Sequence, residues 1–385
     1  MNNLLLNKNL ESARNKYKHF VQSCLKKHGE FSLTPKAEAS PFALCFGIFA
    51  LHLIGESNFL KDYEIFKILK QNIEKYRISR SQESVLKLDK PYLQLLTFSL
   101  SCLSILDFFK YGMFEEFINP LISKDIRKDL NVLKALEGKP QSGNFAMFMA
   151  ILLIHANEYM GKNTQTLIDE WVELHIKHMN KYGFWGPSNG MTHLQFQNGY
   201  HQYEIFEYLD IDNPKKSVAA QSVSMLSDQS GQFAPYPGGG GCYDYDAVSL
   251  LTNNGVSVEE YKPTLMKTVE SIIGSQNADG GFGESQYIRP RKVKNVVKGM
   301  KHLIGPYIPA TVERTKYFLT LLRPKHDRVH THWSRYSREW SESDLWDSWF
   351  RMMAIARIQT SFFPELDAHW GFINYPGIGY YHGAK

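Results

Sequence analysis

Two aspartates stand in the segment of the chain whose residue types are best suited to acid chemistry. Asp244 and Asp246 belong to the segment 238–246, which reads GGGGCYDYD. Glycines let a backbone approach a ligand closely, and a carboxyl group that faces an aromatic cavity has its pKa raised by desolvation. We therefore predict that Asp246 is a general acid and Asp244 its hydrogen-bond partner. The structural alternatives are a helix N-cap at Asp244 and complementation of the helix dipole by Asp246.

A second group of candidates surrounds two histidines. His201 and Glu204 are three residues apart, so on a helix they share a face. They would serve as a base with its orienting carboxylate, or as two metal ligands. His193 precedes them in a glycine-containing loop. A purely structural histidine is the alternative at both positions.

The other candidates lie near expected helix starts. Asp347 would reach the same cavity one turn into a helix capped by Ser343 or Asp344. Aromatic residues near these starts would either line a substrate cavity or pack in the core. We predict catalytic roles for Asp244, Asp246, His201 and Asp347. We predict substrate contacts for His193, Tyr200, Glu204, Tyr243, Tyr245, Trp185, Trp333 and Trp346.

No local spacing of ligand residues predicts a metal site. The four cysteines are scattered, without the spacing of a disulfide framework or a zinc finger. The chain also lacks a Walker A loop, a Rossmann fingerprint after a strand and an HExxH motif. The sequence therefore requires no cofactor, while a divalent metal bound by Cys242, the nearby aspartates and a histidine stays open.

Composition and charge restrict the classes of partner. The chain has 385 residues, 43% of them hydrophobic and 14% aromatic, and a formal net charge of +5. Because this charge is modest, no nucleic-acid partner is expected. The N-terminus lacks a signal-peptide pattern. The longest apolar runs, 42–54 and 145–155, are shorter than the ~20 residues that span a bilayer. We therefore expect a cytoplasmic protein.

A glycine–aromatic motif recurs at nearly constant spacing. It reads GFWG at 183–186, GQF at 231–233 and GGFG at 280–283, and its phenylalanines are 49 residues apart. WGF at 370–372 is a degenerate fourth copy. A repeat of this length is one supersecondary unit, which buries its apolar face by stacking on its neighbours.

Two kinds of helix alternate along the chain. Charged amphipathic segments, expected to form outer helices, span 10–26, 61–75, 114–136, 166–180, 214–229 and 257–276. Segments that are apolar on most faces, expected to form inner helices, span 41–55, 92–109, 144–157, 198–209, 243–251 and 344–359. A helix that is apolar all round is buried, and a one-sided helix covers it. We predict an all-α (α/α)6 toroid of six outer–inner pairs in a single domain, 1–385.

A long insertion interrupts this alternation before the last inner helix. It spans 284–343, opens with a basic run over 289–301 and continues with histidines and tryptophans. A long insertion in a compact domain is usually a lid or a partner surface. The alternative is a solvent-exposed excursion with a short helix of its own. We predict that 289–301 contacts a diphosphate group or, peripherally, a membrane surface.

The chain resembles the terpenoid cyclase/protein prenyltransferase superfamily of (α/α)6 toroids. The run SQNADGGFG at 275–283 is similar to that superfamily's repeat, in which glutamine precedes a glycine-rich aromatic turn. The tripeptide GCY at 241–243 is similar to the start of an inner helix in prenyltransferase β-subunits, where the cysteine is a zinc ligand. DYD at 244–246 resembles the Asp-x-Asp-Asp motif of class II cyclases, which implies that Asp246 protonates the substrate. Ala247 replaces the last aspartate of that motif.

Three functions are consistent with these residues. The first is acid-initiated isoprenoid chemistry of the cyclase or prenyltransferase type in an aromatic-lined cavity. The second is carbohydrate lysis, hydrolysis or epimerisation, because other (α/α)6 toroids act on sugars with His, Tyr, Asp and Trp around a comparable cleft. The third is a non-catalytic module that binds a ligand or peptide. Since one fold hosts many functions, the fold alone does not choose among them.

Overall fold

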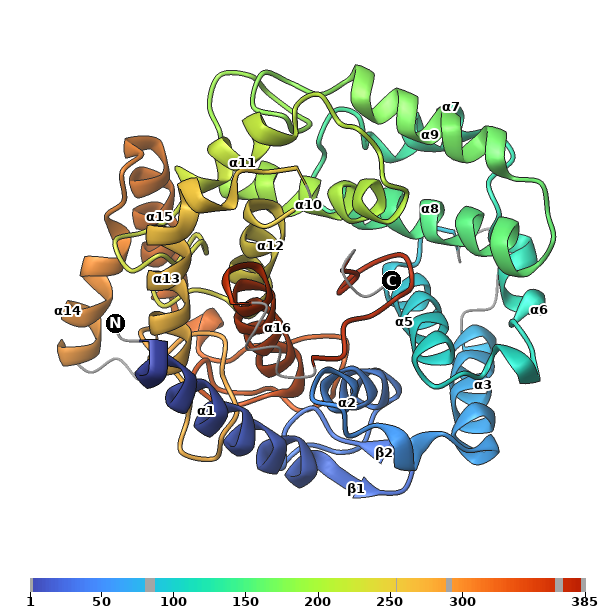
Figure 1. Ribbon diagram of the computed structural model, residues 1–385, viewed down its shortest axis with the longest axis horizontal. Helices are drawn as coiled ribbons and strands as arrows, with labels where there is room; N and C mark the ends of the chain where they lie inside the picture. The colour runs from blue at the N-terminus through green and yellow to red at the C-terminus, as the bar shows by residue number, and fades with distance from the viewer. Residues whose placement is uncertain (1–2, 80–86, 254, 289–292, 364–369, 382–385) are drawn as a thin grey trace. The chain divides into compact units, whose positions relative to one another are not determined.

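The computed structural model describes residues 3–79, 87–253, 255–288, 293–363 and 370–381 (Figure 1). These residues are predominantly helical, and the only paired strands among them are β1 (Leu25–Lys27) and β2 (Glu30–Phe31), which form a small antiparallel hairpin. The all-α prediction is therefore confirmed. The chain divides into two compact units. Unit 1 comprises 1–56, 191–193 and 220–371, and unit 2 comprises 57–190, 194–219 and 372–385.

The predicted inner helices form, and most of their residues are buried. They are α2 (Pro41–Leu53), α5 (Lys90–Ile105), α8 (Ser142–Tyr159), α10 (His193–Tyr208), α12 (Gly241–Leu251) and α16 (Leu345–Phe362). Ser40 and Asp89 accept backbone N–H groups as N-caps of α2 and α5, and each of these helices has proline in its first turn. Both features fix a helix start, because they satisfy or remove N–H groups that have no partner within the helix.

The predicted outer helices form with one exception. They are α1 (Asn3–Cys24), α3 (Tyr63–Ile78), α9 (Gln165–Lys177), α11 (Lys216–Ser224) and α13 (Val258–Gly274). A single helix over 114–136 was expected, and this prediction is wrong. The segment breaks into α6 (Glu115–Ile118), η3 (Asn119–Leu121) and α7 (Ile126–Leu133). Pro120 lacks the N–H that would continue α6, and Asp125 caps α7 as a new helix by accepting the Lys128 N–H.

In unit 1, helices from both ends of the chain are neighbours. α12 packs along α16, and α16 packs against α2 (Figure 1). α1 contacts α2 and α16, α13 contacts α12 and α16, and α1 also touches α13. Three helices that are buried all round thus pack together, and two amphipathic helices cover them, as their apolar patterns predict.

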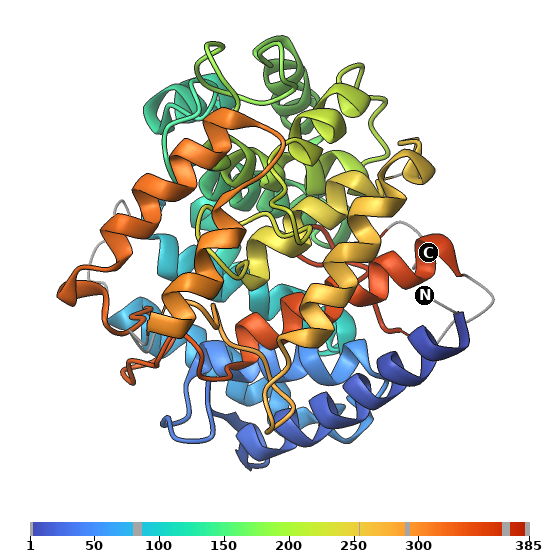
Figure 2. The ribbon, with the colours of Figure 1, turned by 90° about the vertical axis from the view of Figure 1, so that its left-hand side faces the viewer.

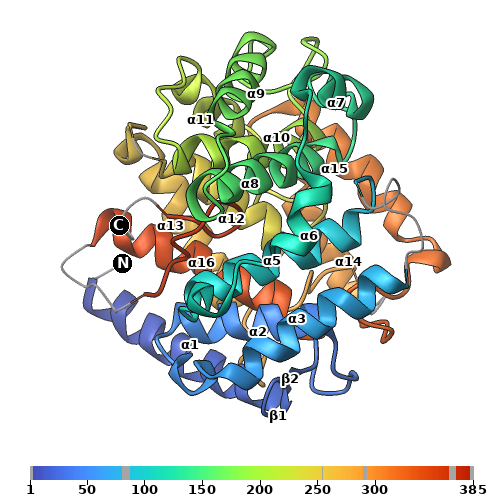
Figure 3. The same cartoon turned by 90° about the vertical axis from the view of Figure 1, so that its right-hand side faces the viewer.

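Unit 2 follows the same rule. α5 packs against α8, and α3 packs against α5 (Figure 3). α7 and α9 both pack against α8 and against each other. The amphipathic helices of this unit therefore cover α5 and α8, which are apolar on most faces.

The glycine–aromatic motif forms the same turn three times, at 180–184, 228–232 and 277–281. In each turn the first N–H donates to the carbonyl oxygen four residues later, over 2.7, 2.8 and 2.9 Å. The first carbonyl accepts the N–H of a glycine three residues later, over 3.1, 3.1 and 3.0 Å. These glycines are Gly183, Gly231 and Gly280, and their φ angles are 79°, 77° and 89°. The repeat is therefore a structural unit, and its glycine is required by a left-handed backbone conformation.

The turns show which residues are equivalent in the three copies of the motif. Counted from the turn glycine, Trp185 is equivalent to Phe233 and Phe282, and all three rings are buried. The 49-residue spacing of phenylalanines had paired Phe184 with Phe233, which is wrong by one position. The degenerate copy at 370–372 does not form this turn, because Gly371 has no positive φ.

The insertion contains helices of its own. They are α14 (Val293–Met300), η4 (Lys301–Leu303), α15 (Ile308–Leu321) and η5 (Pro324–His326), and the two longer helices are drawn in orange in Figure 2. A β-bridge then joins Val329 to Arg338. Part of the basic run, 289–292, lies outside the described residues. No helix in the described part of the chain is long and apolar enough to cross a bilayer.

The turn glycines give a stability prediction. In Gly280→Ala, the new Cβ would combine a positive φ of 89° with a collision against the Lys16 carbonyl of α1. We expect the free energy of unfolding to fall by about 3 kcal/mol. Gly161→Ala is the matched control, because Gly161 has a φ of 64° with no atom within 4 Å of an added Cβ, and it should cost only about 1 kcal/mol. Urea denaturation measures both, and equal losses would contradict the packing of this turn on α1.

Candidate active site

The N-terminal ends of α12 and α16 bring the three predicted aspartates into one region of unit 1. Asp244 and Asp246 lie in the first two turns of α12 and Asp347 in the first turn of α16, and each is at most 1% exposed. Gly240, and not Asp244, is the N-cap of α12, so the capping alternative for Asp244 is wrong. A Cβ at Gly241 would lie 2.8 Å from an oxygen of Asp347. Glycine there lets the two helix ends meet.

A buried arginine of the insertion joins three carboxylates. Arg338 Nη2 donates to Asp347 Oδ2 over 2.7 Å and to Glu284 Oε2 over 3.1 Å. Its Nε donates to Asp344. Asp344 also caps α16, as one of the two predicted caps, by accepting the Asp347 N–H over 2.9 Å. Burial opposes the charge of Arg338, but the three carboxylates outweigh it and raise the pKa of the guanidinium.

A second buried arginine, Arg351 on α16, holds Asp244 on α12. Its Nη1 donates to Asp244 Oδ2 over 3.1 Å, and its Nη2 donates to the carbonyl oxygens of Gly238 and Glu284 over 3.2 and 3.3 Å. Asp244 Oδ1 accepts the N–H of Phe233 over 2.9 Å. Burial raises the pKa of Asp244 to about 7, although Arg351 and the Phe233 N–H favour the ionised form.

Glu284 is the member of this group with the most access to solvent. Its side chain is 18% exposed, whereas those of Asp244, Asp344 and Asp347 are 1% exposed or less. The Tyr236 hydroxyl donates to Glu284 Oε1. Burial raises the pKa of Glu284, and the nearby Asp347 raises it further. Any proton that leaves the cluster therefore has its most direct exit at Glu284.

The acidic cluster, defined as Asp244, Asp246, Glu284, Asp344 and Asp347, holds more negative than positive groups. Four of these carboxyl groups, those of Asp244, Glu284, Asp344 and Asp347, share the two guanidinium groups of Arg338 and Arg351. An unpaired charge in a protein interior is costly, so a buried carboxyl group without a cation takes up a proton. Burial raises the pKa of Asp344 as well. At neutral pH one or more carboxyl groups of the cluster therefore remain protonated.

Cys242 lies among the same carboxylates. Burial raises the pKa of its thiol, and the charges of Asp246, Glu284 and Asp347 raise it further. The protonated thiol is therefore the favoured form in this structure, whereas a cysteine that binds metal does so as the thiolate. Within the described ranges, no three His, Cys, Asp or Glu side chains are placed to hold a metal ion.

Aromatic rings flank the cluster along α12 and α16. Trp346 precedes Asp347, and its ring centroid lies 4.5 Å from that of Trp333 in the insertion and 4.5 Å from that of Phe350. Tyr245 precedes Asp246 and lies 5.3 Å from Phe350. Trp333, Trp346 and Tyr245 were predicted to contact substrate. Trp333 is only partly buried, whereas Trp346 and Tyr245 are core residues.

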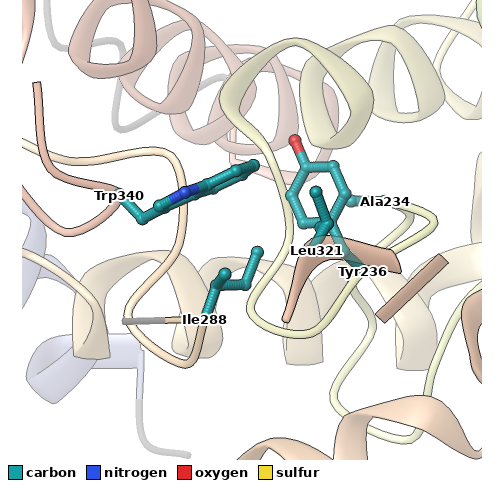
Figure 4. Close-up of a cluster of buried hydrophobic side chains, with 5 residues drawn as sticks. All are labelled: Ala234, Tyr236, Ile288, Leu321 and Trp340. Atoms are coloured by element: carbon teal, nitrogen blue, oxygen red, sulfur yellow. The ribbon is translucent and has the colours of Figure 1, made fainter. Parts of the chain in front are cut away.

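A second aromatic group lies on the Glu284 side. The ring centroid of Tyr236 is 6.0 Å from that of Tyr243, a predicted substrate contact, and 5.8 Å from that of Trp340. Figure 4 shows the buried apolar cluster Ala234, Tyr236, Ile288, Leu321 and Trp340. The hydroxyl group of Tyr236 points away from the other labelled side chains. The hydroxyl group that donates to Glu284 therefore belongs to a ring that packs against other aromatic side chains.

His193 anchors the insertion in unit 1. Its Nδ1 lies 2.7 Å from Glu313 Oε2 on α15, and its backbone N–H donates to the same oxygen over 3.1 Å. Burial lowers the pKa of His193, although Glu313 opposes this. The neutral ring therefore donates its Nδ1–H to Glu313, so His193 positions α15. No contact with a carboxylate of the acidic cluster is observed for it.

The remaining predicted residues belong to unit 2. Glu204 accepts the hydroxyl of Tyr200, so the expected pairing of Glu204 with His201 is not formed. His201 is buried, and burial lowers its pKa to about 3, so its ring is neutral at physiological pH. Trp185 is 1% exposed and donates its Nε1–H to the His175 carbonyl over 2.9 Å, as a core residue.

Sequence reasoning missed Arg338, Arg351, Glu284 and Tyr236. Arg351 had a detectable signal, because a charged residue within a helix that is apolar all round must have a buried partner. No such signal marked Arg338, because it lies 13 positions before Arg351 and follows the helices of the insertion. Glu284 follows directly on the third glycine–aromatic motif, at the point where the insertion begins.

Comparisons with family models, with curated proteins and with solved structures found no match to this chain.

The cluster predicts how stability depends on pH. The folded-state pKa of Asp244, about 7, lies above its ordinary value of 3.8, so the folded state binds this proton more tightly than the unfolded state. The contribution of this group is present at low pH and is lost as pH rises from about 4 to about 7. Asp244→Asn should therefore show a smaller loss of melting temperature between about pH 5 and pH 8 than the wild type.

The slope should be reduced and not abolished, because Glu284 and Asp344 remain and their pKa values are raised in the same direction. Glu259→Gln is the control, since the Glu259 side chain is 72% exposed. The same pH slope in the wild type and Asp244→Asn would show that Asp244 does not hold a proton near neutral pH.

Proposed function

We propose that this protein is an enzyme that donates a proton from the acidic cluster of unit 1 to its substrate. The observation that carries the proposal is the surplus of buried carboxyl groups over the two arginines. A carboxyl group that stays protonated near neutral pH is a general acid. Asp246 is the acid assigned by the sequence motif. Glu284, with its partly exposed side chain, connects the cluster to solvent and returns the proton.

An isoprenoid is the first candidate substrate. The carboxylic O–H would be transferred to a substrate C=C bond, whose π electrons form the new C–H bond. A carboxylate and a carbocation at the neighbouring carbon result. Aromatic faces stabilise such cations, and this proposal is supported by the rings of Tyr236, Tyr243 and Trp333 around the cluster. The DYD resemblance points to the same class of chemistry.

The (α/α)6 toroid remains our proposal for the whole chain. It is supported by the order of the helices, which alternate between amphipathic and apolar, and by the contacts of unit 1. There the first outer helix, α1, touches the last, α13, and the first inner helix, α2, packs against the last, α16. Such contacts between the first and last pairs are expected where helix pairs form a closed ring.

A carbohydrate is the second candidate substrate for the same carboxyl groups. A groove of about 490 Å3 in unit 1 is lined mainly by serine, asparagine, glutamine and glycine. Amide and hydroxyl side chains suit the hydroxyl groups of a sugar, whereas an isoprenoid calls for an apolar wall. The groove shares Gly238 with the loop that Arg351 holds. In this alternative, Asp246 and Glu284 are the acid–base pair of a glycan reaction.

Product analysis in D2O tests the proposed acid. Purified protein would be incubated with prenyl diphosphates and polyprenols, and products analysed by mass spectrometry. Asp246→Asn and Glu284→Gln should each lower turnover at least about a hundredfold, because each removes a proton-transfer group. Wild-type product should carry one solvent deuterium.

Glu259→Gln is the matched control for the loss of a carboxylate and should keep full turnover. Unchanged turnover in both cluster variants would reject the acid role. Loss of oligosaccharide turnover in these variants, with no isoprenoid product from the wild type, would assign the cluster to carbohydrate chemistry.

A further inference from the structure

The polar groove in unit 1 has a different character from the acidic cluster. Its walls come from the loop 230–238, the end of α13, the segment 286–287 and the residues 298–302. None of its described lining residues is acidic, while Lys298, Lys301 and His302 all line it. A groove with this charge attracts an anion, and its serine and amide side chains suit hydroxyl groups.

A buried histidine that lines this groove has an unused ring nitrogen. His302 is 5% exposed, and its Nδ1 lies 2.6 Å from Ser230 Oγ and 3.3 Å from Asp228 Oδ2. Ser230 donates its hydroxyl to Asp228 over 2.8 Å, so the Ser230 oxygen accepts the Nδ1–H of His302. The other ring nitrogen, Nε2, is buried and has no hydrogen-bond partner among the described residues.

The unused Nε2 atom points to a ligand. Nearly all buried polar atoms have a partner, and the protein supplies none to this atom. Tyr287 stacks on the imidazole at 4.5 Å between ring centroids and holds its plane. Nε2 would accept a ligand O–H when the ring is neutral and donate to a ligand oxygen when it is protonated. Either state suits a molecule that carries hydroxyl and phosphate oxygens.

Two lysines supply the charge for such a molecule. Lys298 lies in the last turn of α14 and Lys301 begins η4, three positions later, and both side chains are exposed. Neither makes an ion pair with a described residue of the chain. Ammonium groups on one side of a groove bind phosphate through charge-assisted hydrogen bonds.

We propose that this groove binds the phosphate group of a hydroxylated phosphate ester, such as a sugar phosphate. Lys298 and Lys301 bind the phosphate oxygens, and His302 Nε2 bonds to a ligand oxygen at the buried end. The serine and amide side chains bind the hydroxyl groups. This site does not depend on the proposed reaction of the acidic cluster, because it uses none of its carboxyl groups.

Isothermal titration calorimetry on the full chain tests the proposal with inorganic phosphate, glucose 6-phosphate and glucose. We expect both phosphates to bind and glucose 6-phosphate to bind more tightly than glucose. The double variant Lys298→Gln/Lys301→Gln should bind glucose 6-phosphate at least about tenfold more weakly, since it loses two charge-assisted hydrogen bonds. His302→Gln should also weaken binding, and a cooperative melting transition without ligand will show that this variant is folded.

Lys316→Gln/Lys325→Gln is the matched control, with the same change of charge at two other exposed lysines of the insertion. It should bind glucose 6-phosphate within about twofold of the wild type, because nonspecific charge effects are screened by salt. Equal weakening in the control and in the groove variant would overturn the proposal. So would equal affinity for glucose and glucose 6-phosphate, or no heat with either phosphate.

Discussion

The imbalance between four carboxyl groups and the two buried arginines that they share is the constraint on which the site in unit 1 depends. Arg338 reaches the cluster from the insertion, and Arg351 reaches it from α16. Removing either partner of a buried ion pair leaves a costly uncompensated charge. The insertion is therefore tied to the helix ends electrostatically, and the carboxyl groups left without a cation keep protons. The same arrangement of charges therefore holds the insertion in place and keeps some of the carboxyl groups protonated.

The repeat accounts for the buried position of Asp244. In one copy, the backbone N–H of Phe282, the residue after the turn, donates to Ser348, the fourth residue of α16. In the preceding copy, the amide of Phe233 donates to Asp244, the fourth residue of α12. A neutral serine satisfies the same hydrogen bond without a counter-ion, whereas the aspartate requires Arg351. The aspartate therefore adds a proton-binding group to a position that is otherwise structural.

The sequence predicted much of the helical order and little of the charge network. Helix order follows from local patterns, since apolar periodicity, Ser40 and Asp344 as caps and the turn glycine at Gly280 act within a few residues. The division of the third outer helix depends on Pro120 and Asp125 acting together. The partners of Asp347 and Asp244 are long-range, and the positions of Arg338 and Glu284 depend on how the insertion folds back. The spacing of residues in the sequence does not indicate where the insertion contacts the helix ends.

Infrared spectroscopy of the folded protein at neutral pH shows directly whether the acidic cluster holds a proton. A protonated carboxyl group has a carbonyl band distinct from that of a carboxylate, and the band shifts in D2O. We predict a carboxylic acid band near neutral pH that weakens in Glu284→Gln or Asp244→Asn, because those groups have raised pKa values. A spectrum with carboxylate bands alone at neutral pH would contradict the stored proton, and with it the proposed acid chemistry.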